Sequence, residues 1–519
     1  MYYYRHEART SHPGDAPGMG NAVTVTAITG VTSLKKTPGE TGLCIFPIIE
    51  IIPIPDVSPY DLFRVLGVKK GYILESMEGL PRRAVRSIVG LEPDLTFTID
   101  DSIACEGDRN LSDIVGEFEQ GTPLSLFRKI SDRFQYCGQP GRGFTGGLVG
   151  YCSYDLVHSI TGGMVQSGKD DTPFIRLMLS TRGIVYDHVK SCCTLFDDLI
   201  LPPGTDQREE KARACERLSS LREKIRGISK GLPMTVRPGK RELSFTATPS
   251  REAYEGIVRQ AKEHIMAGDI FQVVLSRKIS CPFPGDPLSI YGSIRAINPS
   301  PYLYYLHFGD EAVIGSSPEM LVRVVEKTVT TVPIAGTRPR GNSEKEDDAL
   351  GRELLADEKE RAEHLMLVDL ARNDIGRISS FGSVSVPEFY ALEKFSHVQH
   401  IVSRVEGTVA EGLDRFDVLS SCFPAGTVSG APKIRAMQII ADLEGRPRGL
   451  YAGAVGYAGF NELFEFAIAI RTLRVKDGVA EFSTGAGIVA DSVPEKEFEE
   501  TEFKARAMVN ALARAGDAP

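Results

Sequence analysis

The segments that read as β-strands in the C-terminal half of the chain do not alternate with helices one for one. Residues 301–334 contain three β-rich segments in succession, and residues 449–487 contain several more. Long helices are expected over 344–376 and 494–516, after the two runs. A parallel sheet needs a crossover, usually a helix, between successive strands, whereas antiparallel strands can be joined by short turns. The order of segments therefore predicts an α+β fold with large antiparallel β-sheets and helices packed outside them.

A charged and turn-rich segment divides the chain near its middle. Residues 203–250 contain the charged helical stretch REEKARACERLSSLREKIRG, followed by KGLPMTVRPGKRELSFTATPS. A helix followed by such a linker is typical of a domain boundary. We therefore divide the chain into an N-terminal half, 36–235, and a C-terminal half, 248–512. Residues 1–35 are polar and rich in Gly and Pro, and they are predicted to be a disordered extension without an apolar signal core.

The composition excludes several classes of protein. The formal net charge is −9, which argues against nucleic acid as a partner because phosphate binding needs a basic surface. The nine cysteines form no C-x-x-C pair, a usage typical of a reduced, cytoplasmic protein. No apolar run approaches the roughly 20 residues that a membrane span needs. We expect a cytoplasmic protein with neither nucleic acid nor membrane as a partner.

Two pairs of carboxylates have the spacing that places them on one face of a helix. Glu360 and Glu363 are three residues apart, and Glu497 and Glu500 repeat the spacing. Carboxylates without cysteine make a hard oxygen site that suits Mg²⁺. A di-iron site would need Glu-x-x-His on two helices, which is absent because His364 directly follows Glu363. Two solvated helix faces would show the same spacing, so the pattern alone leaves both readings open.

Three turns combine Gly with Ser or Thr in a way that suits an anion. They are GTRPRG at 336–341, FPAGTVSGAPK at 423–433 and TGAGIVADS at 484–492. Glycine lets the backbone approach a ligand closely, so that consecutive N–H groups can face an anion. Arg471 ends a strand-like segment and could add a bidentate guanidinium. Each turn alone could be an ordinary tight turn, but together with Arg471 they predict a small substrate that carries a carboxylate.

One histidine, His400, is a candidate for acid–base chemistry. It lies in the strand-like segment SHVQHIVSRV, three residues after His397, and a histidine on a strand can equally be structural. The H-E-x-x-H and P-loop motifs do not occur in the sequence. The residues by themselves leave the role of His400 undecided.

Five long segments together resemble the chorismate-using enzymes, and among them the large subunits of anthranilate synthase. They are PIAGTRPRG, ERAEHLMLVDLARNDIGRIS, FPAGTVSGAPKIRAMQIIADLEG, GLYAGAVGY and TGAGIVADSVPEKEFEETEFKA, in the order of the family. The resemblance is strong over 248–507 and looser over 40–200, where YILESMEG and GGLVGYCSYD carry it. It implies two intertwined halves, of which 248–512 binds chorismate and 36–235 has a regulatory or structural role.

The resemblance also implies roles for the residues already singled out. Glu363 and Glu500 would bind Mg²⁺, supported by Glu360 and Glu497, and the metal would hold the ring carboxylate of chorismate. His400 and Thr427 would be catalytic, the histidine assisting departure of the ring hydroxyl. The implied substrate-binding residues are Gly336, Thr337, Tyr451, Arg471, Gly485, Ala486 and Gly487.

Two positions bear on the nucleophile. The related aminodeoxychorismate synthases typically carry a lysine, thought to attack the ring, where this chain has Ala335. Isochorismate and salicylate synthases carry a lysine just before VVLSR, where this chain has Gln272, and an amide is a poor base. The resemblance thus implies direct attack by ammonia, then elimination of pyruvate to give anthranilate. An aminodeoxychorismate synthase, or a relative that only binds chorismate or tryptophan, remains an alternative.

The resemblance implies a partner and an inhibitor as well. No glutaminase motif lies in this chain, so a separate glutamine amidotransferase subunit would supply ammonia. LESMEG at 74–79 and NPSPYLYYL at 298–306 resemble the element that senses tryptophan. Apolar and aromatic groups suit an indole, while a carboxylate and a hydroxyl suit an amino-acid head group. The residues expected around tryptophan, between the two halves, are Glu75, Ser76, Pro301, Tyr302 and Leu303.

Overall fold

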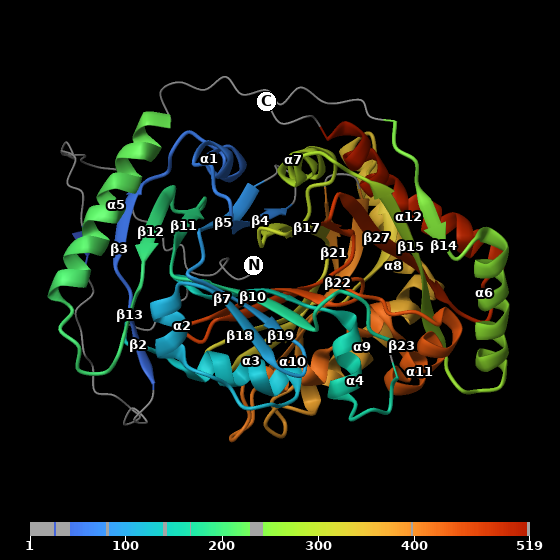
Figure 1. The fold of residues 1–519 in the computed structure, drawn as a ribbon. Coiled ribbons are helices and arrows are strands. Elements are labelled where there is room, and N and C mark those ends of the chain that lie inside the picture. The colour runs from blue at the N-terminus through green and yellow to red at the C-terminus, as the bar shows by residue number, and fades with distance from the viewer. Residues whose placement is uncertain are drawn as a thin grey trace.

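The computed structural model describes residues 25–26, 42–78, 83–138, 143–166, 168–228, 242–395 and 398–515. Apart from β1, the predicted N-terminal extension lies outside these residues, and so does His397. Two large antiparallel sheets pack against each other with helices around them (Figure 1). Within the described ranges, no helix is both long enough and apolar enough to cross a membrane.

The first sheet runs from N-terminal strands to C-terminal strands. Its order is β1-β3-β12-β11-β5-β4-β16-β17-β26-β27-β15-β14, with β23 paired to β15, and its neighbours are antiparallel. The bounds are β1 Val25–Thr26, β3 Ile49–Pro53, β4 Gly71–Glu78, β5 Arg83–Leu91, β11 Arg182–Asp187, β12 Cys192–Asp197, β14 Thr246–Thr248, β15 Gln272–Pro282, β16 Tyr302–His307, β17 Glu311–Ser317, β23 Gly430–Ala431, β26 Thr472–Lys476 and β27 Val479–Ile488.

The second sheet likewise combines strands of both halves, with C-terminal strands at one end and N-terminal strands at the other. Its order is β20-β22-β19-β18-β25-β24-β9-β10-β6-β7, with β21 paired to β22, and a small third sheet has the order β13-β2-β8. The bounds are β2 Leu43–Phe46, β6 Leu95–Ile99, β7 Ile103–Gly107, β8 Phe134–Tyr136, β9 Gly147–Cys152, β10 Ile175–Ser180, β13 Leu199–Leu201, β18 Met320–Val325, β19 Thr328–Thr331, β20 Ile334–Pro339, β21 Ser385–Lys394, β22 Val398–Thr408, β24 Ala454–Gly459 and β25 Phe464–Ile468.

Both large sheets contain a junction between the two halves of the chain. In the first sheet β4 pairs with β16, and Glu75 lies opposite Leu303. In the second sheet β9 pairs with β24, and Tyr151 lies opposite Val455. Because strand pairing crosses both junctions, the halves share their sheets rather than forming separate domains. The predicted α+β architecture of two intertwined halves is confirmed.

Helices cover the outer faces of the sheets. Helices α1, α5, α7 and α12 pack on the first sheet, α3 and α10 on the second, and α6 and α11 on β15. The bounds are α1 Pro59–Val65, α2 Arg109–Val115, α3 Pro123–Asp132, α4 Val157–Ile160, α5 Arg208–Ile228, α6 Arg251–Met266, α7 Pro287–Ile297, α8 Glu344–Ala356, α9 Glu358–Gly376, α10 Arg415–Cys422, α11 Lys433–Glu444 and α12 Pro494–Arg514, with the 3₁₀ turns η1 Tyr154–Leu156 and η2 Gly426–Val428.

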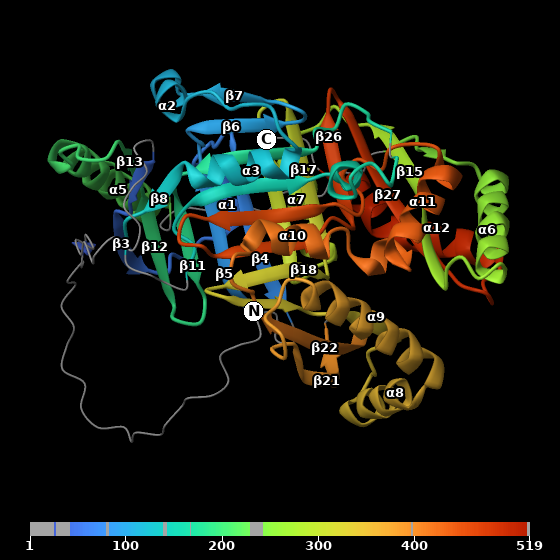
Figure 2. The same ribbon diagram turned by 90° about the horizontal axis from the view of Figure 1, so that it is seen from below.

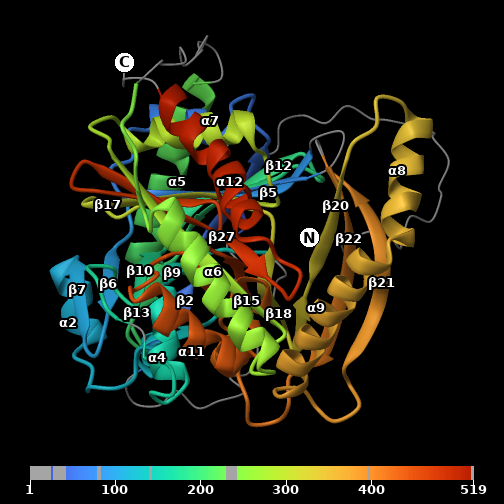
Figure 3. The same ribbon diagram turned by 90° about the vertical axis from the view of Figure 1, so that its right-hand side faces the viewer.

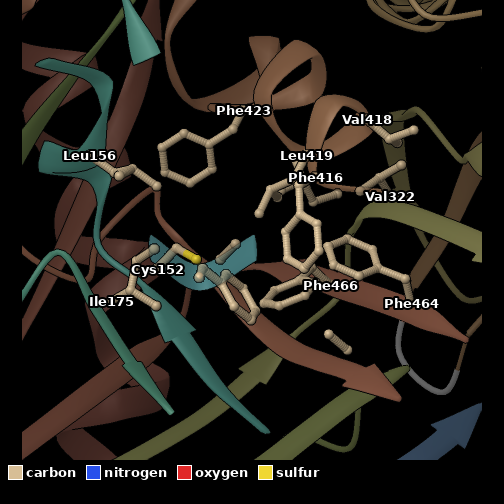
Figure 4. Packing of buried hydrophobic residues seen from close by; sticks show 14 of the residues in the cluster. Cys152, Leu156, Ile175, Val322, Phe416, Val418, Leu419, Phe423, Phe464 and Phe466 are labelled. Carbon is tan, nitrogen blue, oxygen red and sulfur yellow. The ribbon is translucent and has the colours of Figure 1, made fainter. Parts of the chain in front are cut away.

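Aromatic side chains fill the core on both sides of the second sheet. Tyr72, Tyr151 and Tyr304 are buried between the two large sheets. On the outer face, Phe416 of α10 packs edge-on against Phe464 of β25, with 6.0 Å between ring centroids (Figure 4). Fully burying an aromatic side chain stabilises a fold by about 1.5–3 kcal/mol relative to leaving it exposed. The sheets that position the site are therefore held by packing as well as by hydrogen bonds.

Helices α8 and α9 lie along β20–β22 and form a lobe at one side of the molecule (Figures 2 and 3). A single helix was expected over 344–376, but the chain breaks at Asp357. The Asp357 carboxylate accepts hydrogen bonds from the backbone N–H groups of Lys359 and Glu360, at 3.0 and 3.1 Å. An aspartate that caps a helix in this way begins a new helix rather than continuing the old one. This cap fixes where α9 begins, and so where its acidic face points.

Candidate active site

His400 lies on β22 opposite an irregularity in β20. The pairing of β20 with β22 shifts between Ala335 and Arg338, and Gly336 adopts a φ of +70° there. The His400 Nδ1 atom lies 2.7 Å from the carbonyl oxygen of Gly336 and 3.1 Å from the Thr337 Oγ1 atom. A ring nitrogen that faces a carbonyl oxygen must carry the proton, so Nε2 of the neutral ring is the free acceptor. Two of the predicted substrate-binding residues therefore orient the predicted catalytic histidine.

Arg471 lies close enough to His400 to influence its protonation. Burial lowers the pKa of His400, the hydrogen bond to Gly336 opposes that shift, and the Arg471 charge lowers the pKa further. The imidazole is therefore neutral at pH 7. Burial also lowers the pKa of Arg471, although its side chain remains accessible to solvent. Among the described residues the Arg471 guanidinium has no hydrogen-bond or ion-pair partner, so it is free to bind a carboxylate.

Arg471 stands where the chain passes from one sheet to the other. It follows β25 of the second sheet and precedes β26 of the first. Its φ is +51°, a left-handed conformation that costs a non-glycine residue about 1–2 kcal/mol. The surrounding structure must therefore hold the residue in this conformation, as is common for residues in binding sites. The sequence predicted that a strand-like segment ends at Arg471, but it gave no sign that the chain passes to the other sheet there.

The predicted acidic pairs lie on helices whose charges act on one another. The Glu363 side chain is exposed as a whole, but neighbouring atoms partly desolvate its carboxyl and raise its pKa. The negative charges of Glu360 and Glu500 raise this pKa further. Burial raises the pKa of Glu497, a hydrogen bond from Ser492 opposes this, and the Glu500 charge adds to it. Glu363 on α9 and Glu500 on α12 therefore face each other closely enough to repel.

These carboxylates fit a hard cation, but they do not enclose one by themselves. Lys504 pairs with Glu500 at 2.7 Å, and Arg338 donates to Glu360 at 3.2 Å. In the described part of the chain, no three His, Cys, Asp or Glu side chains gather closely enough to hold a metal ion. Mg²⁺ commonly uses one or two protein carboxylates and completes its shell with water and substrate oxygens. The repelling carboxylates of α9 and α12 match that requirement.

The glycines of β27 make room for two polar side chains. Gly485 lies opposite Ser276 of β15, and a Cβ atom on Gly485 would lie 2.4 Å from the Tyr451 hydroxyl. A Cβ atom on Gly487 would lie 2.7 Å from the Gln272 Nε2 atom. The Ala486 side chain is fully buried among the residues under α6 and α11, so only its backbone is available to a ligand. The structure thus brings Tyr451, Gln272 and the glycines of β27 together.

A half-buried glutamate that the sequence analysis did not single out lies beside Thr427. Glu319 follows β17, and Thr427 lies in the 3₁₀ turn η2. Burial raises the pKa of Glu319 to about 7, although the Thr427 side chain opposes the shift. Both residues line a cavity of about 40 Å³, whose other walls include Leu321 and Leu370. An acidic residue between two apolar strands, as in AVIGSSPEMLVRVV, was the sequence signal that could have revealed it.

A larger cavity of about 400 Å³ lies between the two large sheets. All five residues expected around tryptophan line it together, namely Glu75, Ser76, Pro301, Tyr302 and Leu303. The Ser76 hydroxyl is buried, and no other described atom forms a hydrogen bond with it. The opposite wall comes from β18, β24 and β25 of the second sheet. The cavity has the apolar walls and the unsatisfied polar group that an amphipathic ligand requires.

The carboxylates of Glu75 and Glu465, two of the glutamates that line this cavity, already have hydrogen-bond partners. Glu75 accepts a hydrogen bond from Tyr291 at 2.5 Å and pairs with Arg295 at 2.8 Å, so its charge is largely neutralised. Glu465 accepts hydrogen bonds at 3.0 Å from the hydroxyl groups of Tyr302 and Tyr457. Glu465 therefore faces the cavity with two tyrosines beside it, and the sequence analysis did not anticipate it.

Comparison with known proteins identifies the family. The model of the chorismate binding enzymes matches residues 73–510. The chain therefore belongs to the family of chorismate binding enzymes.

Within the family, the chain is similar to proteins named anthranilate synthase component 1. That of Acetivibrio thermocellus is 43% identical over 86% of this chain and 90% of the relative, and that of Pseudomonas aeruginosa is 43% identical over 88% and 93%. The crystal structure of anthranilate synthase component I from Streptococcus pneumoniae superimposes with a TM-score of 0.71 at 36% identity, covering 83% of this chain and 93% of that one.

Proposed function

We propose that the chain is the large subunit of an anthranilate synthase, which converts chorismate and ammonia into anthranilate, pyruvate and water in tryptophan biosynthesis. The observation that carries this reaction is the Gln272 side chain, which lies against Gly487 where relatives that activate water carry a lysine. An amide can orient ammonia but is a poor base for water. Ala335 is buried and cannot form a covalent adduct with the ring. Both positions favour ammonia as the nucleophile.

Chorismate would be bound by an arginine that has no partner within the part of the protein that the structure describes and, through Mg²⁺, by carboxylates that repel one another. The Arg471 guanidinium is free to pair with a carboxylate of chorismate. Glu363 and Glu500 would hold Mg²⁺ at the other carboxylate, supported by Glu360 and Glu497. When bound, Mg²⁺ supplies positive charge that draws electron density from the ring. The Tyr451 hydroxyl and the backbone of Gly485–Gly487 would line the ring's other side.

Two groups with opposite pKa shifts would carry the proton transfers. Glu319, with a pKa of about 7, retains a proton near neutral pH and suits protonation of the departing ring hydroxyl. His400 is neutral, and its Nδ1–H is bound to Gly336, so Nε2 suits removal of a ring proton as pyruvate leaves. Sequence resemblance assigned hydroxyl departure to His400. The protonation states instead favour Glu319 for that step.

Ammonia would come from a separate glutamine amidotransferase subunit, and tryptophan would inhibit by binding at the cavity that Ser76 lines. A cytoplasmic location follows from this proposed role in biosynthesis. The test is to supply the purified chain with chorismate, Mg²⁺ and either ammonium or glutamine, and to follow anthranilate fluorescence. We expect product with ammonium only. Turnover of glutamine by the isolated chain would contradict the assignment of a separate subunit.

A further inference from the structure

Arg448 and Glu444 form an ion pair that is almost completely enclosed. Each side chain is 1% exposed, and the guanidinium donates to both carboxylate oxygens, at 2.7 and 3.2 Å. Glu444 is the last residue of α11, where the helix dipole disfavours a carboxylate. Replacing a buried ion pair with apolar residues is often neutral or stabilising, so stability alone does not explain such a pair. Its remaining contacts indicate a different purpose.

The Arg448 side chain joins two segments that carry site residues. One terminal nitrogen donates to the carbonyl oxygen of Val428 at 2.9 Å, directly after Thr427. The other donates to the carbonyl oxygen of Val274 at 2.6 Å, two residues after Gln272. A planar guanidinium has donors in fixed directions, so these bonds set the distance between the two segments.

The same pair also contacts β15 at a second position, Ser276, two residues beyond Val274. Glu444 accepts hydrogen bonds from the backbone N–H of Ser276 at 2.8 Å and from its hydroxyl at 3.1 Å. Ser276 lies opposite Gly485 in the first sheet. The Arg448 guanidinium lies 5.5 Å from the ring centroid of Tyr451, whose hydroxyl lies over Gly485. The pair therefore contacts or adjoins every segment that presents Thr427, Gln272, Tyr451 and Gly485.

We propose that Arg448 and Glu444 are positioning residues for the reaction of ammonia with chorismate. The pair holds the Gln272 strand at a fixed distance from the Thr427 turn and keeps the Tyr451 ring over Gly485. Neither side chain contacts Arg471 or the acidic faces of α9 and α12, which would anchor the substrate. The pair thus governs the alignment of the reacting groups rather than the affinity for chorismate. This inference rests on the function proposed above.

The test compares Arg448→Lys with Arg474→Lys. Lysine keeps the charge but cannot span two carbonyl groups and a carboxylate with a fixed geometry. Arg474 is the matched control because it is equally buried and pairs with Glu311 at 2.8 Å, and because its other partners, Asp171 and Glu481, lie outside the site. A misplacement of about 1 Å can cost about 100-fold in rate. We expect Arg448→Lys to lower kcat for the ammonium reaction by about 10- to 100-fold, with the KM for chorismate changed less than about threefold.

Thermal unfolding of both variants separates alignment from folding. We expect Arg474→Lys to lose at least as much thermal stability as Arg448→Lys while keeping kcat within about threefold of the wild type. The double variant Arg448→Met with Glu444→Leu removes both charges, so it should fold and still show the fall in kcat. Wild-type kcat in folded Arg448→Lys, or an equal loss of kcat in Arg474→Lys, would overturn the inference. An inactive wild-type chain would instead refute the proposed function itself.

Discussion

At the scale of single residues, the proposed proton transfers depend on two groups whose pKa values move in opposite directions. Burial raises the pKa of the Glu319 carboxyl to about 7 and lowers that of the His400 imidazole. The acid form of Glu319 is present below pH 7 and is lost as the pH rises through its pKa. The base form of His400 is present above its lowered pKa. Protonated Glu319 and neutral His400 therefore coexist near neutral pH. A lower pKa for Glu319, or a higher pKa for His400, would have removed one of these two forms at that pH.

Glu319→Gln should lower kcat by about 100- to 10,000-fold, the usual contribution of a general acid. In the wild type, the rate per free ammonia should fall as the pH rises through about 7, because Glu319 loses its proton there. Removal of that carboxyl should abolish this alkaline limb. Asp374→Asn is the control, because Asp374 lines the same cavity and burial also raises the pKa of its carboxyl. An alkaline limb that persists in Glu319→Gln, or disappears in Asp374→Asn, would assign the acid to another group.

Ser76→Phe should give an active enzyme that tryptophan no longer inhibits. The buried Ser76 hydroxyl lines the 400 Å³ cavity, and a phenyl ring there would fill the space expected for the indole. Tryptophan bound in this cavity can inhibit only if it favours one arrangement of the two halves over another. We therefore expect tryptophan to raise the KM for chorismate in the wild type. Ser76→Ala leaves the space open and should remain sensitive. Equal inhibition of all three forms would place the regulatory site elsewhere.

At the scale of secondary-structure elements, local irregularities position the site. The bulge in β20 turns the Gly336 carbonyl toward His400, and the Asp357 cap begins α9 with its acidic face toward α12. Sequence patterns predicted the strands and α12 well, because apolar periodicity reflects burial. They missed the break at Asp357 and the passage from one sheet to the other at Arg471, because tertiary contacts decide both. The sequence did not reveal the raised pKa of Glu319 for the same reason, because the burial that raises this pKa depends on tertiary packing.

Gly336→Ala tests the bulge. The added Cβ atom would lie 3.0 Å from the Leu354 Cδ1 atom and 3.2 Å from the Glu360 Oε2 atom, in a residue with a φ of +70°. Relief of this crowding would move the carbonyl that orients His400, so kcat should fall by at least about tenfold. Gly382→Ala is the control, because Gly382 has a φ of +76° and no described atom within 4 Å of the added Cβ. We expect the two variants to lose similar amounts of stability, but only Gly336→Ala to lose kcat. Equal kcat values for the two variants would show that the bulge does not orient His400.

At the scale of the whole molecule, the chain folds as one unit because both sheets cross the boundary between the halves. A fragment of residues 242–515 would lack β4 and β9, and would therefore expose the edges of β16 and β24. Exposed edge strands pair with other chains and promote aggregation. We expect the fragment to be insoluble when expressed alone and soluble when co-expressed with residues 42–228, as size-exclusion chromatography would show. A soluble, monomeric fragment would mean that the C-terminal half folds by itself.

The nucleophile that attacks the ring separates an anthranilate synthase from its water-using relatives, and product analysis with labelled reactants identifies it. The chain is incubated with chorismate, Mg²⁺ and ¹⁵N-ammonium in ¹⁸O-water, and the ring products are identified by mass spectrometry. Because Gln272 and Ala335 replace the lysines expected for water activation and for covalent attack, we expect ¹⁵N-anthranilate and unlabelled chorismate. A ring product that carries ¹⁸O, or an amino-chorismate that never loses pyruvate, would contradict it.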